Sequence, residues 1–248
     1  MNNCPVEYKQ TDPRWSDLPY QVAGESATIG GSGCGPTCAA MLIETLTGKK
    51  FTPEDACSWS LAHGFKALGH GTYYGYFKKQ FAAFGIDCVQ LNYSSLYGNP
   101  DAAAHQDVRD LLKEGGYIIA CMGKGLWTNS GHFVVVWWMD DDTVYILDPA
   151  SDKPERLYGD ADTFFREVKY YWWVDAGDYN KEVNMSYDMF KQYMDRYLEE
   201  LAQLPPSEWA AKNLKDAVSL GFTDGSAPRA LATREQVALM IRMAVYGN

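Results

Sequence analysis

A glycine-rich turn that leads into a cysteine and an apolar run constrains this chain most. Residues 30–42 read GGSGCGPTCAAML, and the second half of this segment has the composition of a helix. Pro36 suits the first turn of a helix, where its missing N–H leaves no hydrogen bond unmade. Cys34 then lies just before a helix N-terminus, where unpaired N–H groups and the helix dipole stabilise a thiolate. Because the thiolate is the reactive form of cysteine, Cys34 is a candidate nucleophile.

Composition excludes several classes of function. The 248 residues are 46% hydrophobic, which suits one large domain or one domain with a small module. A formal net charge of −10 argues against binding to nucleic acid or to an anionic membrane. No stretch of about 18 apolar residues occurs, so we expect no membrane span. The N-terminus lacks a basic region followed by an apolar run, so we expect no signal peptide and a cytoplasmic protein in the producing cell.

The cysteines and histidines form no pattern typical of a metal site. No CxxC pair occurs, and no histidine stands at a zinc-like spacing from a cysteine. We therefore expect no metal or cofactor, and reduced thiols that are mostly buried, with Cys38 packed inside its helix. The acidic run 140–142 is more typical of a solvated hairpin turn than of a calcium site, and His63 and His70 are more typical of exposed loops. The six cysteines are Cys4, Cys34, Cys38, Cys57, Cys88 and Cys121.

Hydrophobic periodicity predicts helices in the first half of the chain and strands after it. The predicted helices cover residues 35–47, 52–63, 73–84 and 101–113, after an extended arm at 5–21. The predicted strands cover residues 86–91, 117–122, 133–139, 144–147 and 170–174. Helices followed by an antiparallel sheet indicate an α+β fold.

The remaining chain predicts a separate helical segment. Apolar residues between Tyr187 and Leu204 recur at helical spacing, and two prolines end that run. Two short helices around a glycine-rich turn follow, the last starting at Thr233, which has capping-box spacing to Gln236. The predicted organisation is a catalytic domain at 1–175, a linker and amphipathic helix at 176–204, and a small helical module at 205–248.

A cysteine nucleophile needs a base, and the base needs a group that orients it. His132 is the leading base because it opens a strongly apolar strand, and Asp148 is the leading orienting group because it follows the next strand. If strands 133–139 and 143–147 pair across a three-residue turn, His132 lies opposite Ala150 and diagonal to Asp148 on one face. A register shifted by one residue would place His132 and Asp148 on opposite faces.

The attack of a thiolate on a carbonyl also needs donors for the oxyanion. The backbone N–H of Cys34 is one candidate, and a side-chain amide is the usual second. Gln10 in the N-terminal arm is the preferred amide, with Gln21 as the alternative, because spacing does not choose between them. Purely structural interpretations stay open as well, since a lone cysteine usually packs in a core and a lone histidine at a strand end is usually just hydrogen-bonded.

Five short motifs follow one another in the order Cys, His, Asp. They are YKQxDPRW at 8–15, GCGP at 33–36, TP at 52–53, GHF at 131–133 and DP at 148–149. Together they resemble the papain-like cysteine peptidases related to the double-glycine leader peptidases of bacteriocin exporters, over roughly residues 5–174. The resemblance implies a papain-like α+β fold.

The same resemblance implies roles for four residues. Cys34 would be the nucleophile and His132 the base. Asp148 would orient the base, and Gln10 would donate to the oxyanion. The leader peptidases carry their glutamine six residues before the cysteine, where this chain has Thr28, which argues against a leader peptidase.

Residues 207–246 are similar to a single S-layer-homology-like module, through SEWA, AVSLGFTDG and TREQVA. Such modules accompany cell-wall proteins and occur at the ends of phage lytic enzymes. The leading hypothesis is therefore a bacteriophage endolysin that cuts the peptide part of peptidoglycan, with the module contacting a cell-wall polymer after release. The alternatives are an intracellular peptidase acting on a protein or peptide, and a catalytically inert papain-like binding module.

Overall fold

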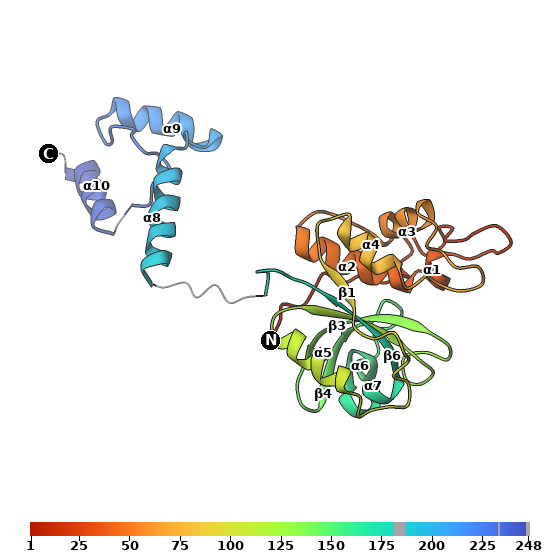
Figure 1. Cartoon of the computed structure of the whole chain (residues 1–248). Helices are drawn as coiled ribbons and strands as arrows, with labels where there is room; N and C mark the ends of the chain where they lie inside the picture. Colours follow the sequence, from red (N-terminus) through yellow and green to blue (C-terminus); the bar gives the residue numbers. More distant parts are fainter. Residues whose placement is uncertain (181–186, 233, 247–248) are drawn as a thin grey trace. The chain divides into compact units, whose positions relative to one another are not determined.

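The computed structural model describes residues 1–180, 187–232 and 234–246, and the chain divides into two units, Met1–Lys181 and Glu182–Asn248. The helices of the first unit are α1 (Ile29–Ser32), α2 (Cys34–Thr47), α3 (Pro53–Ala62), α4 (Tyr76–Ala82), α5 (Ala103–Lys113), α6 (Pro154–Leu157) and α7 (Ala161–Glu167). Its strands are β1 (Cys88–Gln90), β2 (Tyr117–Met122), β3 (His132–Met139), β4 (Thr143–Leu147), β5 (Tyr158–Asp160) and β6 (Val168–Val174). The strands form one antiparallel sheet in the order β1-β6-β2-β3-β4-β5. Figure 1 labels β1, β3, β4 and β6 of this sheet.

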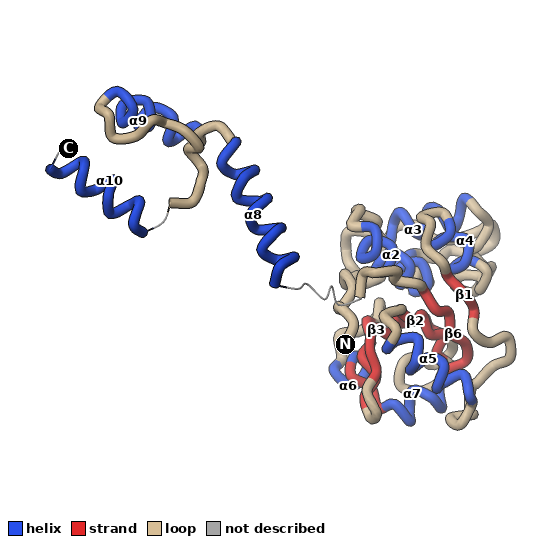
Figure 2. Tube along the Cα trace, turned by 60° about the vertical axis from the view of Figure 1, so that its left-hand side comes forward, coloured by secondary structure: helices blue, strands red, loops and turns tan. Residues whose placement is uncertain are grey.

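The centre of the sheet is buried on both faces. Along β2, Ile119 and Cys121 join the core under α2, α3 and α4, whereas Ile118 and Ala120 join a second core with residues of α5 and α7. Figure 2 shows α2, α3 and α4 gathered on one side of the strands and α5 and α7 on the other. This helix and antiparallel-sheet architecture confirms the α+β prediction.

The end of α2, the helix that begins with the candidate nucleophile, and the start of α3 follow from local sequence. Gly48 ends α2 with φ of 66°, a left-handed conformation that glycine adopts without strain. Thr52 begins α3 with a capping box, in which its hydroxyl accepts from the N–H of Asp55 and the Asp55 carboxylate accepts from the N–H of Thr52. Local sequence thus sets where α2 ends and where α3 begins.

The sequence was wrong about several other boundaries. The segment predicted as a glycine-rich turn contains the helical turn α1, which the Thr28 side chain caps. The helix predicted at 73–84 is shorter, because α4 begins at Tyr76, and Tyr73 is exposed in the preceding turn. The strand predicted at 86–91 is reduced to β1, and α6, β5 and α7 were not predicted.

The β3–β4 hairpin has the predicted register at one end and a different one at the other. A three-residue turn would place Met139 opposite Thr143, but Met139 pairs with Val144. A bulge between Val136 and Trp138 absorbs the extra residue, so Val135 pairs with Leu147 as predicted. The correct register is therefore restored toward the end of the hairpin that carries the candidate base.

The second unit contains three described helices, α8 (Tyr187–Gln203), α9 (Glu208–Ser219) and α10 (Arg234–Tyr246). The predicted amphipathic helix corresponds to α8. Thr233, the predicted cap of the last helix, lies outside the described residues. Across the described ranges, no helix combines the length and the apolar character that crossing a bilayer requires.

Candidate active site

Two glycines fix the position of Cys34, the first residue of α2. A Cβ on Gly33 would lie 2.6 Å from the carbonyl oxygen of Ile29, so only glycine fits between α1 and α2. A Cβ on Gly35 would lie 3.3 Å from the side chains of both Phe133 and Thr72. The backbone around Cys34 therefore approaches β3 closely, which brings its half-buried thiol to the start of that strand.

His132 and Asp148 meet at that end of the hairpin. Nε2 of His132 lies 2.7 Å from Oδ1 of Asp148, and their side chains are 8% and 0% exposed. The same Oδ1 accepts the N–H of Ala150 at 2.8 Å, so a tight turn holds the carboxylate in place. Because Asp148 engages Nε2, the other ring nitrogen, Nδ1, is the one left for Cys34. The predicted proximity of His132 and Asp148 is confirmed.

The environment of Cys34 favours its thiolate. Burial raises the pKa of the Cys34 thiol, but the hydrogen bond and the charge of His132 lower it. The backbone N–H groups of Phe133 and Gly35 lower it further, and the net pKa lies below the usual value for cysteine. Burial lowers the pKa of His132, but its interactions with Asp148 and Cys34 raise it to about 9. The two shifts together favour a thiolate–imidazolium pair near neutral pH.

The other cysteines show the opposite shift. Burial raises the pKa of Cys38 and Cys57 well above the usual value, and it raises the pKa of Cys121 to about 11 and of Cys88 to about 12. Cys38 lies inside α2 with no exposed surface, which confirms the prediction that it is a packing residue. Compared with these four cysteines, Cys34 alone has a lowered pKa, and it therefore favours the thiolate, which is the nucleophilic form.

Gln10 lies in the N-terminal arm and contacts Gly30, which comes four residues before Cys34 in the chain. Its Nε2 donates to the carbonyl oxygen of Gly30 at 2.7 Å, and its backbone N–H donates to the oxygen of Pro149 at 2.8 Å. The arm thus connects the segment before α2 with the turn after Asp148. Gln21, the alternative amide, is exposed and accepts the N–H of Ala27 at 3.1 Å. The structure brings Gln10, and not Gln21, to this region.

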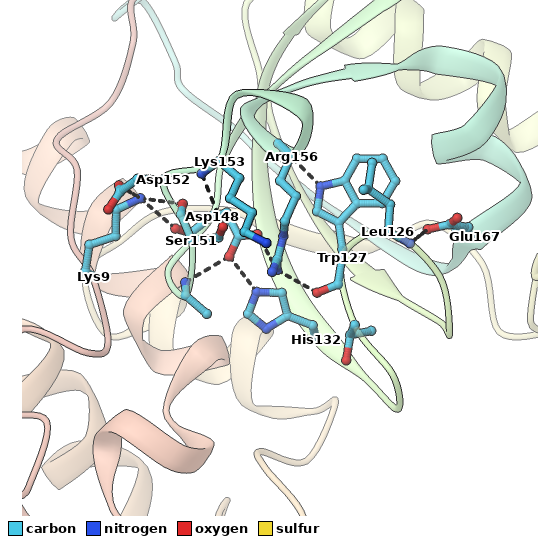
Figure 3. Close-up of polar contacts among 12 residues, drawn as sticks. Lys9, Leu126, Trp127, His132, Asp148, Ser151, Asp152, Lys153, Arg156 and Glu167 are labelled. Atoms are coloured by element: carbon cyan, nitrogen blue, oxygen red, sulfur yellow. Dashed lines mark hydrogen bonds and ion pairs between the residues drawn. The ribbon is translucent and has the colours of Figure 1, made fainter.

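Sequence reasoning missed two cations next to Asp148. Lys9 donates from Nζ to the carbonyl oxygens of Asp148 and Ser151 at 2.9 and 2.8 Å, and it pairs with the exposed Asp152 at 2.7 Å. Arg156 places Nη2 2.5 Å from Oδ2 of Asp148 (Figure 3). Lys9 was part of a quoted motif, but Arg156 stood in a segment for which the sequence predicted no element.

The remaining candidates form no second site in the described part of the chain. His63 stacks on Trp59 with the two ring centroids 3.8 Å apart, and both His63 and His70 are exposed. Asp140 accepts the N–H groups of Asp142 and Thr143, so the acidic run forms a hairpin turn as predicted. No group of acidic, histidine or cysteine side chains there could hold a metal ion.

Comparison with known proteins gives one family match. Residues 8–180 match the Peptidase_C39 like family, a span that includes Gln10, Cys34, His132 and Asp148. A solved structure of a candidate C39-like peptidase from Bacillus anthracis is similar with a TM-score of 0.45 and 15% identity, over 68% of this chain and 94% of that chain. No curated protein matches the chain.

Proposed function

This chain belongs to the Peptidase_C39 like family and is a cysteine peptidase, and we propose that its catalytic residues are Cys34, His132 and Asp148. One observation carries the assignment. Cys34 has a lowered pKa because of a partner, His132, whose own pKa is about 9 and whose far nitrogen is held by the buried Asp148. Covalent acyl transfer requires a nucleophile, a base in contact with it and a third group that orients the base.

The proposed reaction is the hydrolysis of an amide bond in two steps. The Cys34 thiolate attacks the carbonyl carbon, and the imidazolium of His132 gives its proton to the departing amine, which leaves an acyl-enzyme. Neutral His132 then takes a proton from water, the hydroxide attacks the thioester, and the thiolate leaves as the carboxylic acid forms. Asp148 keeps the ring oriented and stabilises its charged form in the first step.

Two donors are proposed for the oxyanion. The N–H of Cys34 stands at the first position of α2, where a helix supplies no partner for it. Gln10 is 5% exposed and uses one of its two amide hydrogens on Gly30, which leaves the second for a substrate oxygen. Donors fixed in a buried site stabilise developing charge more strongly than water does.

The proposed substrate is the peptide part of peptidoglycan, cut by an enzyme of the phage endolysin type. The support is the similarity of residues 207–246 to a single S-layer-homology-like module, a segment that includes α9 and α10. In this proposal the module contacts a cell-wall polymer, and the protein is made in the cytoplasm and acts on the wall after release.

The test is the release of new amino groups from purified peptidoglycan, together with the fall in turbidity of a wall suspension. The wild type should release amines, and Cys34→Ala should release none. Cys38→Ala is the matched control because it removes a thiol from the same helix one turn away, and it should keep the activity.

The outcomes separate the alternatives. No amines from walls, together with cleavage of a casein-type peptide, would replace peptidoglycan with a protein or peptide substrate. A Cys34 that is alkylated by iodoacetamide no faster at pH 6–7 than an ordinary thiol, with a pKa of about 8.5, would indicate an inert binding module. That result would overturn the catalytic assignment itself.

A further inference from the structure

Arg156 contacts the oxygen of Asp148 that His132 does not use. Nη2 of Arg156, from α6, lies 2.5 Å from Oδ2 of Asp148, while Oδ1 lies 2.7 Å from Nε2 of His132 (Figure 3). We propose that Arg156 is a positioning residue that balances the charge of Asp148 and thereby sets the pH range in which Cys34 and His132 form their ion pair. The inference rests on the proposed catalytic roles of Cys34, His132 and Asp148.

The nitrogen that contacts the carboxylate is also held by the backbone of Trp127. Arg156 also donates from Nη2 to the carbonyl oxygen of Trp127 at 2.5 Å, and the indole N–H of Trp127 donates to the carbonyl oxygen of Arg156 at 2.9 Å. Trp127 is 1% exposed, and a Cβ on Gly159 would lie 2.6 Å from its ring. These two hydrogen bonds to the closely packed Trp127 hold the Arg156 side chain in place, and that side chain is only 17% exposed.

The four side chains alternate in charge when the site is in its reactive form. The Cys34 thiolate is negative, the His132 imidazolium positive, the Asp148 carboxylate negative and the Arg156 guanidinium positive, so the buried group is neutral as a whole. A buried carboxylate without a cation is strongly disfavoured, and its charge would act on the groups beside it. Without Arg156, the uncompensated charge of Asp148 would bind the imidazolium proton more tightly and disfavour the thiolate.

Other charged or titratable groups surround these four side chains. Three belong to the N-terminal arm, namely Glu7, Lys9 and Tyr20, and three are the thiols of Cys38 in α2, Cys57 in α3 and Cys121 in β2. The others are Asp152 after β4, Glu167 at the end of α7 and Lys169 of β6. Lys9 is balanced by Glu7 and Asp152, both at 2.7 Å, and Glu167 accepts the N–H of Leu126. Lys169 approaches Gly131, and no contact in the described ranges joins it to Asp148. These groups leave Arg156 as the cation on the carboxylate of Asp148.

The proposal makes a specific statement about proton affinity. Replacing Arg156 by glutamine removes one positive charge from a site of low dielectric. Both Cys34 and His132 should then bind protons more tightly, by roughly tenfold, which is about one pH unit. A residue that only supports the fold would lower the amount of active protein without moving either titration.

The test follows the alkylation of Cys34 by iodoacetamide from pH 4 to 10, with the modified peptide quantified by mass spectrometry. No substrate is needed, so the assay does not depend on peptidoglycan. In the wild type, the rate should rise once as Cys34 ionises and again as His132 loses its proton near pH 9. In R156Q both inflections should move up by about one pH unit, while R156K, which keeps the charge, should restore them.

Arg109→Gln is the matched control. Arg109 donates to the carbonyl oxygens of Asp140 and Asp141, at the turn end of the same hairpin, so its loss should leave both inflections in place. Unmoved inflections in a folded R156Q would overturn the proposal, and equal shifts in R156K and R156Q would do the same. If R156Q does not fold, Arg156→Met is the second neutral variant. If neither neutral variant folds while R156K does, Arg156 is needed for folding, and the proposal that it acts on the two titrations apart from the fold is overturned. A wild type that shows only one ordinary thiol titration would instead refute the catalytic assignment.

Discussion

Replacing Asp148 by asparagine should lower the pKa of His132 by roughly one to two units. The amide can still accept the N–H of Nε2, so the ring keeps its orientation, but the charge across the 2.7 Å contact disappears. A hydrogen bond to a charged group contributes about 1.5–3 kcal/mol, and each pKa unit corresponds to about 1.4 kcal/mol. The pKa of His132 should therefore fall from about 9 to roughly 7–8.

The sign of the change determines where activity is lost. His132 must carry a proton to release the amine, and it loses that proton as the pH rises through its pKa. At pH 8.5 the protonated fraction, and with it the cleavage rate, should drop roughly three- to twenty-five-fold, while at pH 6 this cause should produce no loss. A loss at pH 6 would measure disturbed orientation instead.

The assay is a pH titration of the imidazole nitrogens by NMR in protein labelled with 15N-histidine. The sequence has four histidines, and His132→Gln identifies the signal that belongs to His132. Asp152→Asn is the matched control, because that carboxylate is 80% exposed and pairs with Lys9, and it should leave the titration unchanged. Circular dichroism should first show that the Asp148 variant is folded. A His132 signal that still titrates near pH 9 without the Asp148 charge would refute the reasoning.

Three further predictions concern the oxyanion donor, a buried ion pair and a tight glycine. Gln10→Ala should lower kcat by roughly 10²–10³-fold with an unchanged Cys34 alkylation profile, whereas Gln21→Ala should have no effect, as a cleavage assay of both variants will measure. Lys66→Met should lower the midpoint of guanidinium unfolding far more than Lys50→Met, because the Lys66 side chain is fully buried against Glu25 at 2.7 Å while Lys50 is 64% exposed. The hydrogen bond from Lys66 lowers the pKa of Glu25 to about 2. The ionised carboxylate therefore stabilises the fold above about pH 4.5, and this stabilisation should be lost as the pH falls toward 2. Acid unfolding of the wild type and of Glu25→Gln will measure the loss. Gly33→Ala should slow alkylation of Cys34 and destabilise the fold, because its Cβ meets the Ile29 carbonyl at 2.6 Å, whereas Gly31→Ala, whose nearest contact is 3.7 Å, should change neither.

The parts of this site that depend on local patterns could be predicted from the sequence. The helix behind Cys34 follows from an apolar run bounded by glycines, and β2 from a fully apolar segment with the same bounds as predicted. The closeness of His132 and Asp148 follows from strand alternation, because His132 begins β3 and Asp148 directly follows β4, near the pair formed by Val135 and Leu147. Only the pairing near this end of the hairpin determines whether the two side chains lie on one face.

The parts of the site that depend on contacts between residues far apart in the chain could not be predicted from the sequence. The bulge beside Trp138 has no signature in the residues around it, yet it restores the register that the longer turn would otherwise have shifted by one residue. The position of Gln10 depends on hydrogen bonds to Gly30 and Pro149, which are 20 and 139 residues away in the chain. Spacing in the sequence carries no information about such contacts.

Arg156 illustrates why charge is the least predictable part of a buried site. The surrounding residues, PERL, are typical of a solvated turn, and an arginine in such a turn is most often exposed. The tryptophan that fixes it precedes β3, and the carboxylate it neutralises follows β4, so the contact exists only after both strands have paired. A thiolate and an imidazolium can be inferred from residue types, but the pH at which they coexist depends on the net charge buried around them. That net charge is a property of the folded sheet, and it connects the catalytic pair to a helix of four residues that no sequence pattern marked.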